Sequence, residues 1–357
     1  MVRQRWTAQR AIRSASVLGW AAAATVLVAA GAACAQEAET DPTTESDAEV
    51  TLPPLGGDHA VGTAVYLWID QDRLEGATSE PGDYRQVRVQ TWWPAETSNA
   101  PRAPYFDRPD LYEKAWRPGT QAFLENVRPA ARLGAPVADA KSAYPVLIYS
   151  HGWNSTRSGA TALMEGLASR GFIVVGVEHA YMGLVVGADG ELTQPTEDHL
   201  SGPREISGTY GGDVAFVIDQ LESQETQVSG RMRLSRIGAI GHSSGFIAAH
   251  RVCATDSRVA ACANIDSPGP SISDIARLGK PAAVLRFERA PSSAMAGLSV
   301  DQRELVSVLN LEGANHLSNM DWGYLQAESE EDRLRAVEHL METAEFLDAF
   351  FSQALAD

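Results

Sequence analysis

The strongest constraint on the fold is an alternation of continuously apolar runs with segments of helical periodicity. Residues 145–150 (PVLIYS) and 172–179 (FIVVGVEH) have almost no polar face, as is typical of strands covered on both sides. Between them, residues 159–171 place apolar side chains at helical spacing and end at a glycine. The alternation continues to a final amphipathic helix over 330–355. This order predicts an α/β fold with a mostly parallel sheet and helices on both faces.

The region before these runs has a different pattern. Residues 60–70 and 84–95 alternate apolar and polar side chains, which predicts antiparallel strands at the N-terminal edge of the sheet. Residues 101–119 are rich in proline and aromatic side chains, and we expect an irregular surface loop there. Further predicted elements are strands over 236–241, 259–266, 281–289 and 304–310, and helices over 211–223 and after Gly245.

The N-terminal segment is typical of an exported protein. A basic start with four arginines and no acid precedes an Ala-rich apolar run over 17–33. A membrane anchor is the alternative, but about 17 residues are marginal for a span. We therefore expect a signal peptide over 1–35 and a periplasmic or secreted protein. Cleavage after Ala35 would release it, whereas lipidation of Cys34 would anchor it, because the residues before Cys34 resemble a lipobox.

An acidic segment follows the predicted signal peptide. Residues 36–50 carry six acidic side chains and no basic or aromatic one, so they cannot bury enough apolar surface to fold. We expect a flexible linker over 36–56 and one catalytic domain over 57–357.

Composition excludes several classes of partner. The formal net charge of −17 argues against binding to nucleic acid or to anionic membrane surfaces. No phosphate-binding loop, haem motif or cluster of metal ligands is present in the sequence, and we expect no cofactor and no metal. Beyond the signal segment the cysteines are Cys253 and Cys262. In an oxidising compartment they are candidates for a disulfide, and the alternative is two buried thiols.

A nucleophile motif stands between a predicted strand and a predicted helix. Residues 241–245 read G-H-S-S-G, and G-x-S-x-G in this context is the nucleophile elbow of serine hydrolases. Side chains at Gly241 and Gly245 would collide with the neighbouring strand and helix. The turn would raise the Ser243 hydroxyl above the carboxyl edge of the sheet, exposed at the turn.

A serine nucleophile needs a base and an acid that orients it, in the chain order Ser, acid, His for this fold. Asp266 follows the next predicted strand, and His316 lies in a loop after the last one. Asp274, Asp301 and other histidines are poorer candidates, because they lie within helices or before a strand. The sequence therefore predicts the triad Ser243, Asp266 and His316.

The predicted oxyanion donors are the backbone N–H groups of Ser244 and Trp153, the latter in the loop that follows the first buried parallel strand. We interpret His151 in this loop as structural. Phe246, behind the nucleophile, and Tyr181, after the second buried strand, are candidates for the substrate pocket.

Five blocks of the sequence together resemble a known family. PVLIYSHGWNSTRSG, LASRGFIVVGVEHAY, RIGAIGHSSG, ANID and GANH are similar, in this order, to the type II platelet-activating factor acetylhydrolases and to bacterial lipase and cutinase relatives. The resemblance implies an α/β-hydrolase fold and the same triad and oxyanion residues. The family often continues GHSxGG, whereas Phe246 replaces the second glycine here, which puts the substrate range in doubt.

The expected function is an exported serine esterase that acts on short or truncated acyl esters, among them phospholipid acetyl esters. Alternatives are a polyester hydrolase, a peptidase or an acyltransferase on the same triad, and a binding domain without catalysis. The substrate is therefore a small-molecule, lipid or polymeric ester. The long segment 180–211 is a candidate lid, and a disordered excursion is the alternative.

Overall fold

The computed structural model describes residues 49–116, 118–140, 142–195, 206–287, 295 and 297–356. The predicted signal peptide and residues 36–48 of the predicted linker lie outside them. Residues 49–56 belong to the folded body, because Leu52 and Leu55 are buried and Leu55 packs against α4 at Gly166. The predicted domain boundary at residue 57 is therefore several residues too late.

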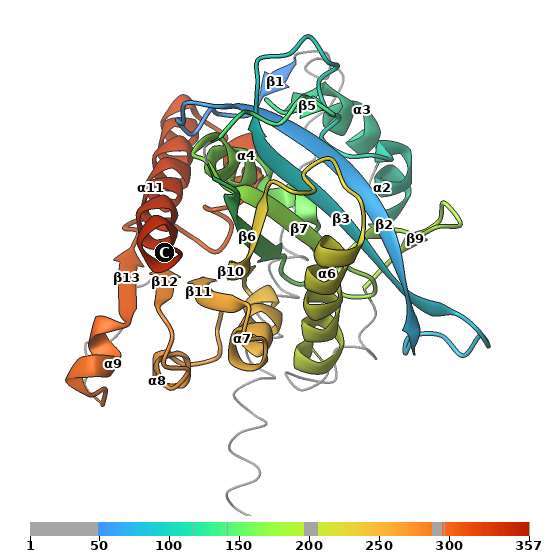
Figure 1. Cartoon of the computed structure of the whole chain (residues 1–357). Helices are drawn as coiled ribbons and strands as arrows, with labels where there is room; N and C mark the ends of the chain where they lie inside the picture. Colours follow the sequence, from blue (N-terminus) through green and yellow to red (C-terminus); the bar gives the residue numbers. More distant parts are fainter. Residues whose placement is uncertain are drawn as a thin grey trace, which may run out of the picture. The chain divides into compact units, whose positions relative to one another are not determined.

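The central sheet has the strand order β13-β12-β11-β10-β6-β7-β3-β2-β5 in the part of the chain that is described. Strands β6, β7, β10, β11, β12 and β13 are parallel to one another, and β3 is antiparallel to both of its neighbours β7 and β2. The predicted mixed sheet with antiparallel strands from the N-terminal part is confirmed. Figure 1 shows the long β2–β3 pair crossing one side of the sheet.

The sheet strands are β2 (Ala60–Leu74), β3 (Tyr84–Ala95), β5 (Arg132–Leu133), β6 (Tyr144–Ser150), β7 (Ile173–His179), β10 (Met232–His242), β11 (Val259–Ile265), β12 (Ala282–Arg286) and β13 (Val306–Asn310). Short pairs are formed by β1 (Val50–Thr51) with β4 (Val127–Arg128) and by β8 (Val185–Val186) with β9 (Leu192–Thr193).

The helices are α2 (Pro109–Ala115), α3 (Thr120–Asn126), α4 (Thr161–Ser169), α6 (Gly211–Ser223), α7 (Gly245–Thr255), α8 (Ile272–Ala276), α9 (Val300–Glu304), α10 (Asp321–Leu325) and α11 (Glu330–Ala354). A 3-10 turn over Arg157–Ala160 precedes α4, and a π-helical turn over Ile206–Tyr210 precedes α6.

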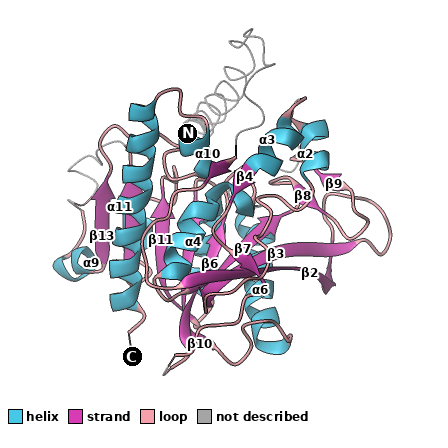
Figure 2. Ribbon diagram, turned by 90° about the horizontal axis from the view of Figure 1, so that it is seen from above, coloured by secondary structure: helices cyan, strands magenta, loops and turns pink. Residues whose placement is uncertain are grey.

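Two apolar layers hold the helices on the sheet. Helices α4 and α11 bury Leu163, Leu167, Leu347 and Phe351 on one face, together with sheet residues such as Leu147. On the other face α6, α7 and α8 pack against a second set of buried strand side chains. Figure 1 shows this division, with α6 and α7 on the side opposite α4 and α11, and Figure 2 shows α4, α6 and α11 from above. In the described residues no helix is both long and apolar enough to cross a membrane.

Two segments differ from the sequence-based expectation. Residues 101–119 were expected to be irregular but contain α2. This helix begins at Pro109, and proline is tolerated at the first helical position because the N–H that it lacks would have no partner there. The candidate lid 180–211 contains the β8–β9 pair and the turn before α6, and its residues 196–205 lie outside the described part.

Candidate active site

The loop between β10 and α7 has the geometry of a nucleophile elbow. Ser243 has φ 52°, and its N–H donates to the carbonyl of Ile265 at 2.9 Å. A Cβ at Gly241 would lie 2.3 Å from the Cα of Phe246, and one at Gly245 would lie 2.3 Å from the carbonyl oxygen of Ser150. Such distances leave no room for any side chain, which gives the physical reason for both glycines.

Ser243 is less accessible than the sequence suggested. It was expected to be exposed at the turn, but only 4% of its surface is accessible. Gly152 lies directly against it, since a Cβ on Gly152 would be 3.0 Å from the Cβ of Ser243. The loop after β6 therefore covers the elbow, and its close approach requires glycine at position 152.

Asp266 and His316 lie together although 50 residues separate them in the chain. His316 Nδ1 and Asp266 Oδ2 are 2.6 Å apart, and both side chains are partly exposed. Asp266 directly follows β11 with φ 47°, and its N–H donates to the carbonyl of Leu285 in β12. The buried Asn264 accepts the N–H of Ser267 at 2.7 Å, which fixes the turn that carries the carboxylate.

The ring of His316 lies beside the elbow. Its centroid is 4.7 Å from that of His242, the residue before Ser243. Within the described residues the Ser243 hydroxyl forms no hydrogen bond with His316. Hydrogen bonds of this kind are often long or poorly aligned without substrate. The structure thus brings together the predicted acid and base and sets them next to the predicted nucleophile.

The two predicted oxyanion donors flank Ser243. Ser244 begins α7, and Trp153 follows Gly152 in the covering loop. In the part of the chain that is described, neither backbone N–H is hydrogen-bonded to another group. Both N–H groups are therefore available to a developing negative charge.

His151 holds the loop that carries Trp153. Its Nε2 accepts the N–H of His179 at 3.2 Å, so its proton is on Nδ1, which donates to the carbonyl of Gly152 at 2.7 Å. Burial, followed by the nearby His179, lowers the pKa of His151 to about 3, so the ring is neutral at neutral pH. This bond fixes the plane of the Gly152–Trp153 peptide, in agreement with the structural role expected for His151.

A buried polar network beneath this loop was not predicted from the sequence. Asp213, on α6, accepts hydrogen bonds from Arg85 at 2.7 and 3.0 Å and from His179 Nδ1 at 3.0 Å. His179 Nε2 then accepts the hydroxyl of Ser150 at 2.8 Å. Burial alone would raise the pKa of Asp213, but Arg85 and His179 outweigh it and hold that pKa well below its ordinary value. In the sequence, Glu178 and His179 stand in the block LASRGFIVVGVEHAY, which is part of the family resemblance.

The structure places the two candidate pocket residues in different surroundings. Phe246 is fully buried in the apolar layer between α7 and the sheet. Tyr181 is partly buried with φ 64°, and Glu75 and Asp83 of the β2–β3 pair contribute to the raised pKa of its hydroxyl, after burial itself.

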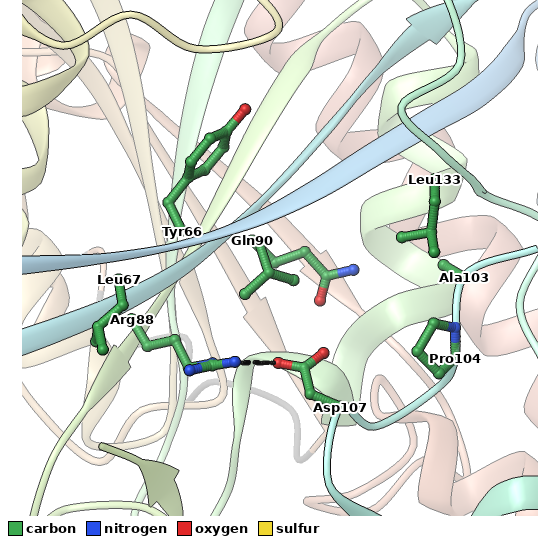
Figure 3. Close-up of a pocket in the computed structure, with 9 residues that line it drawn as sticks. Tyr66, Leu67, Arg88, Gln90, Ala103, Pro104, Asp107 and Leu133 are labelled. Carbon is green, nitrogen blue, oxygen red and sulfur yellow. Dashed lines mark hydrogen bonds and ion pairs between the residues drawn. The ribbon is translucent and has the colours of Figure 1, made fainter. Parts of the chain in front are cut away.

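A separate pocket lies away from Ser243. It has a volume of about 400 Å³ and is formed by β2, β3 and the segment after Ala103. Figure 3 shows the ion pair of Arg88 with Asp107 at its base, at a distance of 2.9 Å. The residues around it include no serine, cysteine or histidine, so this pocket contains no nucleophile.

Cys253 and Cys262 are free, buried thiols in the structure, which corresponds to the second of the two alternatives considered for them. The neighbouring Cys253 and burial raise the pKa of the Cys262 thiol. Among the described residues no group of histidine, cysteine, aspartate or glutamate is arranged to hold a metal ion.

Comparisons with known proteins indicate the fold and the class of enzyme. The family described as platelet-activating factor acetylhydrolase, isoform II, matches residues 46–183, a region that includes the covering loop but not Ser243. A ferulic acid esterase from Streptomyces cinnamoneus has a similar structure, with a TM-score of 0.63 and 25% identity over 86% of this chain and 94% of that protein.

The fold and these matches define the class of the protein, which is a carboxylic ester hydrolase with the α/β-hydrolase fold. Within this class the chain resembles the type II platelet-activating factor acetylhydrolases over residues 46–183, and the predicted fold class and resemblance are confirmed.

Proposed function

We propose that the protein is an exported serine esterase in which Ser243 is the nucleophile, His316 the base and Asp266 the acid that orients it. The observation that carries this proposal is the 2.6 Å contact between His316 Nδ1 and Asp266 Oδ2 beside the elbow of Ser243. A carboxylate at Nδ1 fixes the tautomer that leaves Nε2 free to take a proton.

The proposed reaction has two halves. The Ser243 oxygen attacks the ester carbonyl, its proton passes to His316 Nε2, and the carbonyl oxygen becomes an oxyanion that accepts the N–H groups of Trp153 and Ser244. The tetrahedral species collapses, the leaving alcohol takes the proton from His316, and an acyl-serine remains. Water, deprotonated by His316, then attacks the acyl carbon and releases the acid, and the Ser243 oxygen regains its proton.

The proposed substrates are esters of short or truncated acyl groups, among them acetyl esters of phospholipids. The matching family is named for acetylhydrolysis, which supports a short acyl group, and the similar structure is a ferulic acid esterase, which supports cleavage of a carboxylic ester. The close cover of Ser243 by Gly152 and the bulk of Trp153 support a short acyl site.

The test is the hydrolysis of p-nitrophenyl acetate by Ser243→Ala and Asp266→Asn. Ser243→Ala should lose about four to six powers of ten in kcat, because the members of a triad act as a unit. Asp266→Asn should lower kcat with little change in KM, whereas Asp274→Asn, at a surface helix cap, serves as the matched control. More than a tenth of wild-type activity in Ser243→Ala, or a larger loss in Asp274→Asn than in Asp266→Asn, would refute the triad.

Export is a separate part of the proposal and has its own test. N-terminal sequencing of the protein recovered outside the cytoplasm should begin at Gln36 if the leader is cleaved after Ala35. If lipidation anchors the protein instead, the membrane fraction should lose it when Cys34 is changed to Ala.

A further inference from the structure

His242, the residue before the nucleophile, joins the elbow to the loop of His316. Its Nε2 lies 3.0 Å from the carbonyl oxygen of His316, and the two rings are 4.7 Å apart with a tilt of 37°. A carbonyl oxygen only accepts hydrogen bonds, so Nε2 of His242 carries the proton and donates it. The side chain is only 3% exposed and comes from the end of β10.

The loop of His316 has few other connections to the sheet. Asn315 and Leu317 are exposed, and within the described residues Asn315 and Ser318 bond mainly to each other. Among the described residues, two hydrogen bonds connect residues 314–318 to strands other than the preceding β13: one to Asp266 after β11 and one to His242 in β10. A weaker one, at 3.4 Å, joins the Ala314 N–H to the carbonyl of Leu311 directly after β13. Asp266 holds the ring at Nδ1, and His242 holds the backbone of the same residue.

We propose that His242 is a positioning residue for His316: through the hydrogen bond to the His316 carbonyl and the contact of the two rings, it sets the distance of the base from Ser243. The proposal rests on the triad of the proposed function. It explains why a buried histidine is placed directly before the nucleophile, where an apolar side chain would satisfy packing alone.

The electrostatics of the pair agree with this role. Burial, followed by the nearby His316, lowers the pKa of His242 to about 4, so His242 is neutral when the base works. His316 becomes positively charged during the proposed reaction, and a second positive charge at ring-contact distance would oppose that step. The other ring nitrogen of His242 is buried without a hydrogen-bond partner in the described residues, and the nearby Asp266, which raises the pKa of His242, does not outweigh burial and His316.

The chain offers a matched control for the test. His339, on α11, is also buried, and its Nε2 lies 3.2 Å from the carbonyl oxygen of Glu312 in the same loop. His242→Leu and His339→Leu therefore each remove one imidazole hydrogen bond to this loop, but only His242 contacts His316.

The experiment compares kcat and KM for p-nitrophenyl acetate, the rate of Ser243 labelling by a fluorophosphonate, and Tm. His242→Leu should lower kcat and the labelling rate together by about 100-fold, the effect expected of a base misplaced by about 1 Å, with KM changed less than threefold. His242→Gln, whose amide can still donate to the carbonyl, should recover at least a tenth of wild-type kcat. His339→Leu should lower Tm and leave kcat within threefold.

The outcomes separate this proposal from the function on which it rests. If Ser243→Ala is active, the triad itself fails. If Ser243→Ala is inactive but His242→Leu keeps kcat within threefold, as expected for His339→Leu, His242 does not position the base. The same conclusion follows if kcat of His242→Gln is no higher than kcat of His242→Leu. If His242→Leu does not fold, His242→Asn, whose amide is too short to reach the carbonyl, replaces it. Equal kcat values for His242→Asn and His242→Gln would then overturn the proposal.

Discussion

Gly245→Ala tests whether the contact between the elbow and the covering loop sets the catalytic geometry. A Cβ at this position would lie 2.3 Å from the carbonyl oxygens of both Ser150 and His151. Ordinary contacts begin near 3.4 Å, so the start of α7 and the end of β6 must separate by about 1 Å. The atoms that obstruct the methyl group are backbone, and no rotation of a side chain can relieve the clash.

This separation acts directly on the proposed chemistry. Ser243 and Ser244 move with α7, whereas Trp153 moves with the loop after β6, so the nucleophile and the second oxyanion donor part from each other. We expect kcat to fall about 100-fold, as for a misplacement of about 1 Å. Overpacking at a buried site should also destabilise the fold by about 1–3 kcal/mol.

The assay is p-nitrophenyl acetate hydrolysis at a temperature at which Gly245→Ala is folded, with Tm measured in parallel. Gly76→Ala is the control, because a Cβ there would meet nothing within 4 Å. Gly76→Ala should match wild type in both measurements. Wild-type kcat in a folded Gly245→Ala variant would refute the reasoning, since it would mean that the two segments can separate without consequence.

Three further predictions concern other parts of the molecule. Alkylation of the unreduced, denatured protein should label both Cys253 and Cys262, and mass spectrometry that finds neither labelled would contradict the free thiols of the structure. Because its pKa is held low in the folded state, Asp213 should stabilise the protein at pH values above about 3.9, the pKa of aspartate in an unfolded chain. This stabilisation should be lost as the pH falls from there toward the lower pKa of the folded state. Urea unfolding should accordingly show a loss of about 3–5 kcal/mol for Asp213→Asn at pH 7 and a smaller difference at pH 3, and equal stability at pH 7 would contradict the buried ion pair. Finally, kcat/KM for p-nitrophenyl esters should decrease as the acyl chain lengthens from four to twelve carbons, and this decrease should be less steep in Trp153→Ala. A wild-type preference for dodecanoyl esters would refute a short acyl site.

The strands and most helices could be predicted because their apolar periodicity is local. Residues 84–95 form β3 with the predicted bounds, and the last helix ends within one residue of its expected end. The helix α2 was missed because proline and aromatic residues were interpreted as loop signals, although their side chains pack in the core. The first domain boundary was placed too late because two buried leucines follow an acidic segment without forming a periodic pattern.

Some residues of the candidate site could likewise be predicted from the sequence, and others could not. Gly241, Ser243 and Gly245 form a local motif, and chain order alone selected Asp266 and His316, which the structure places in contact. The burial of Phe246 in the apolar layer between α7 and the sheet could not be predicted, because sequence distance from Ser243 does not reveal how deeply a side chain is buried. The network around Asp213 escaped prediction because its charged members come from β3 and α6, more than 100 residues apart, and only the fold brings them together.

Ser243 and Asp266 share a backbone feature with a consequence for evolution. Both have a positive φ, of 52° and 47°, in a region where an L side chain costs roughly 1–2 kcal/mol. Glycine would adopt this conformation without that cost, and even after its greater loss of chain entropy, roughly 0.5–1 kcal/mol, the exchange would be neutral or favourable for folding. A search for thermostable variants that ignores activity would thus be free to discard the two side chains on which the proposed chemistry depends.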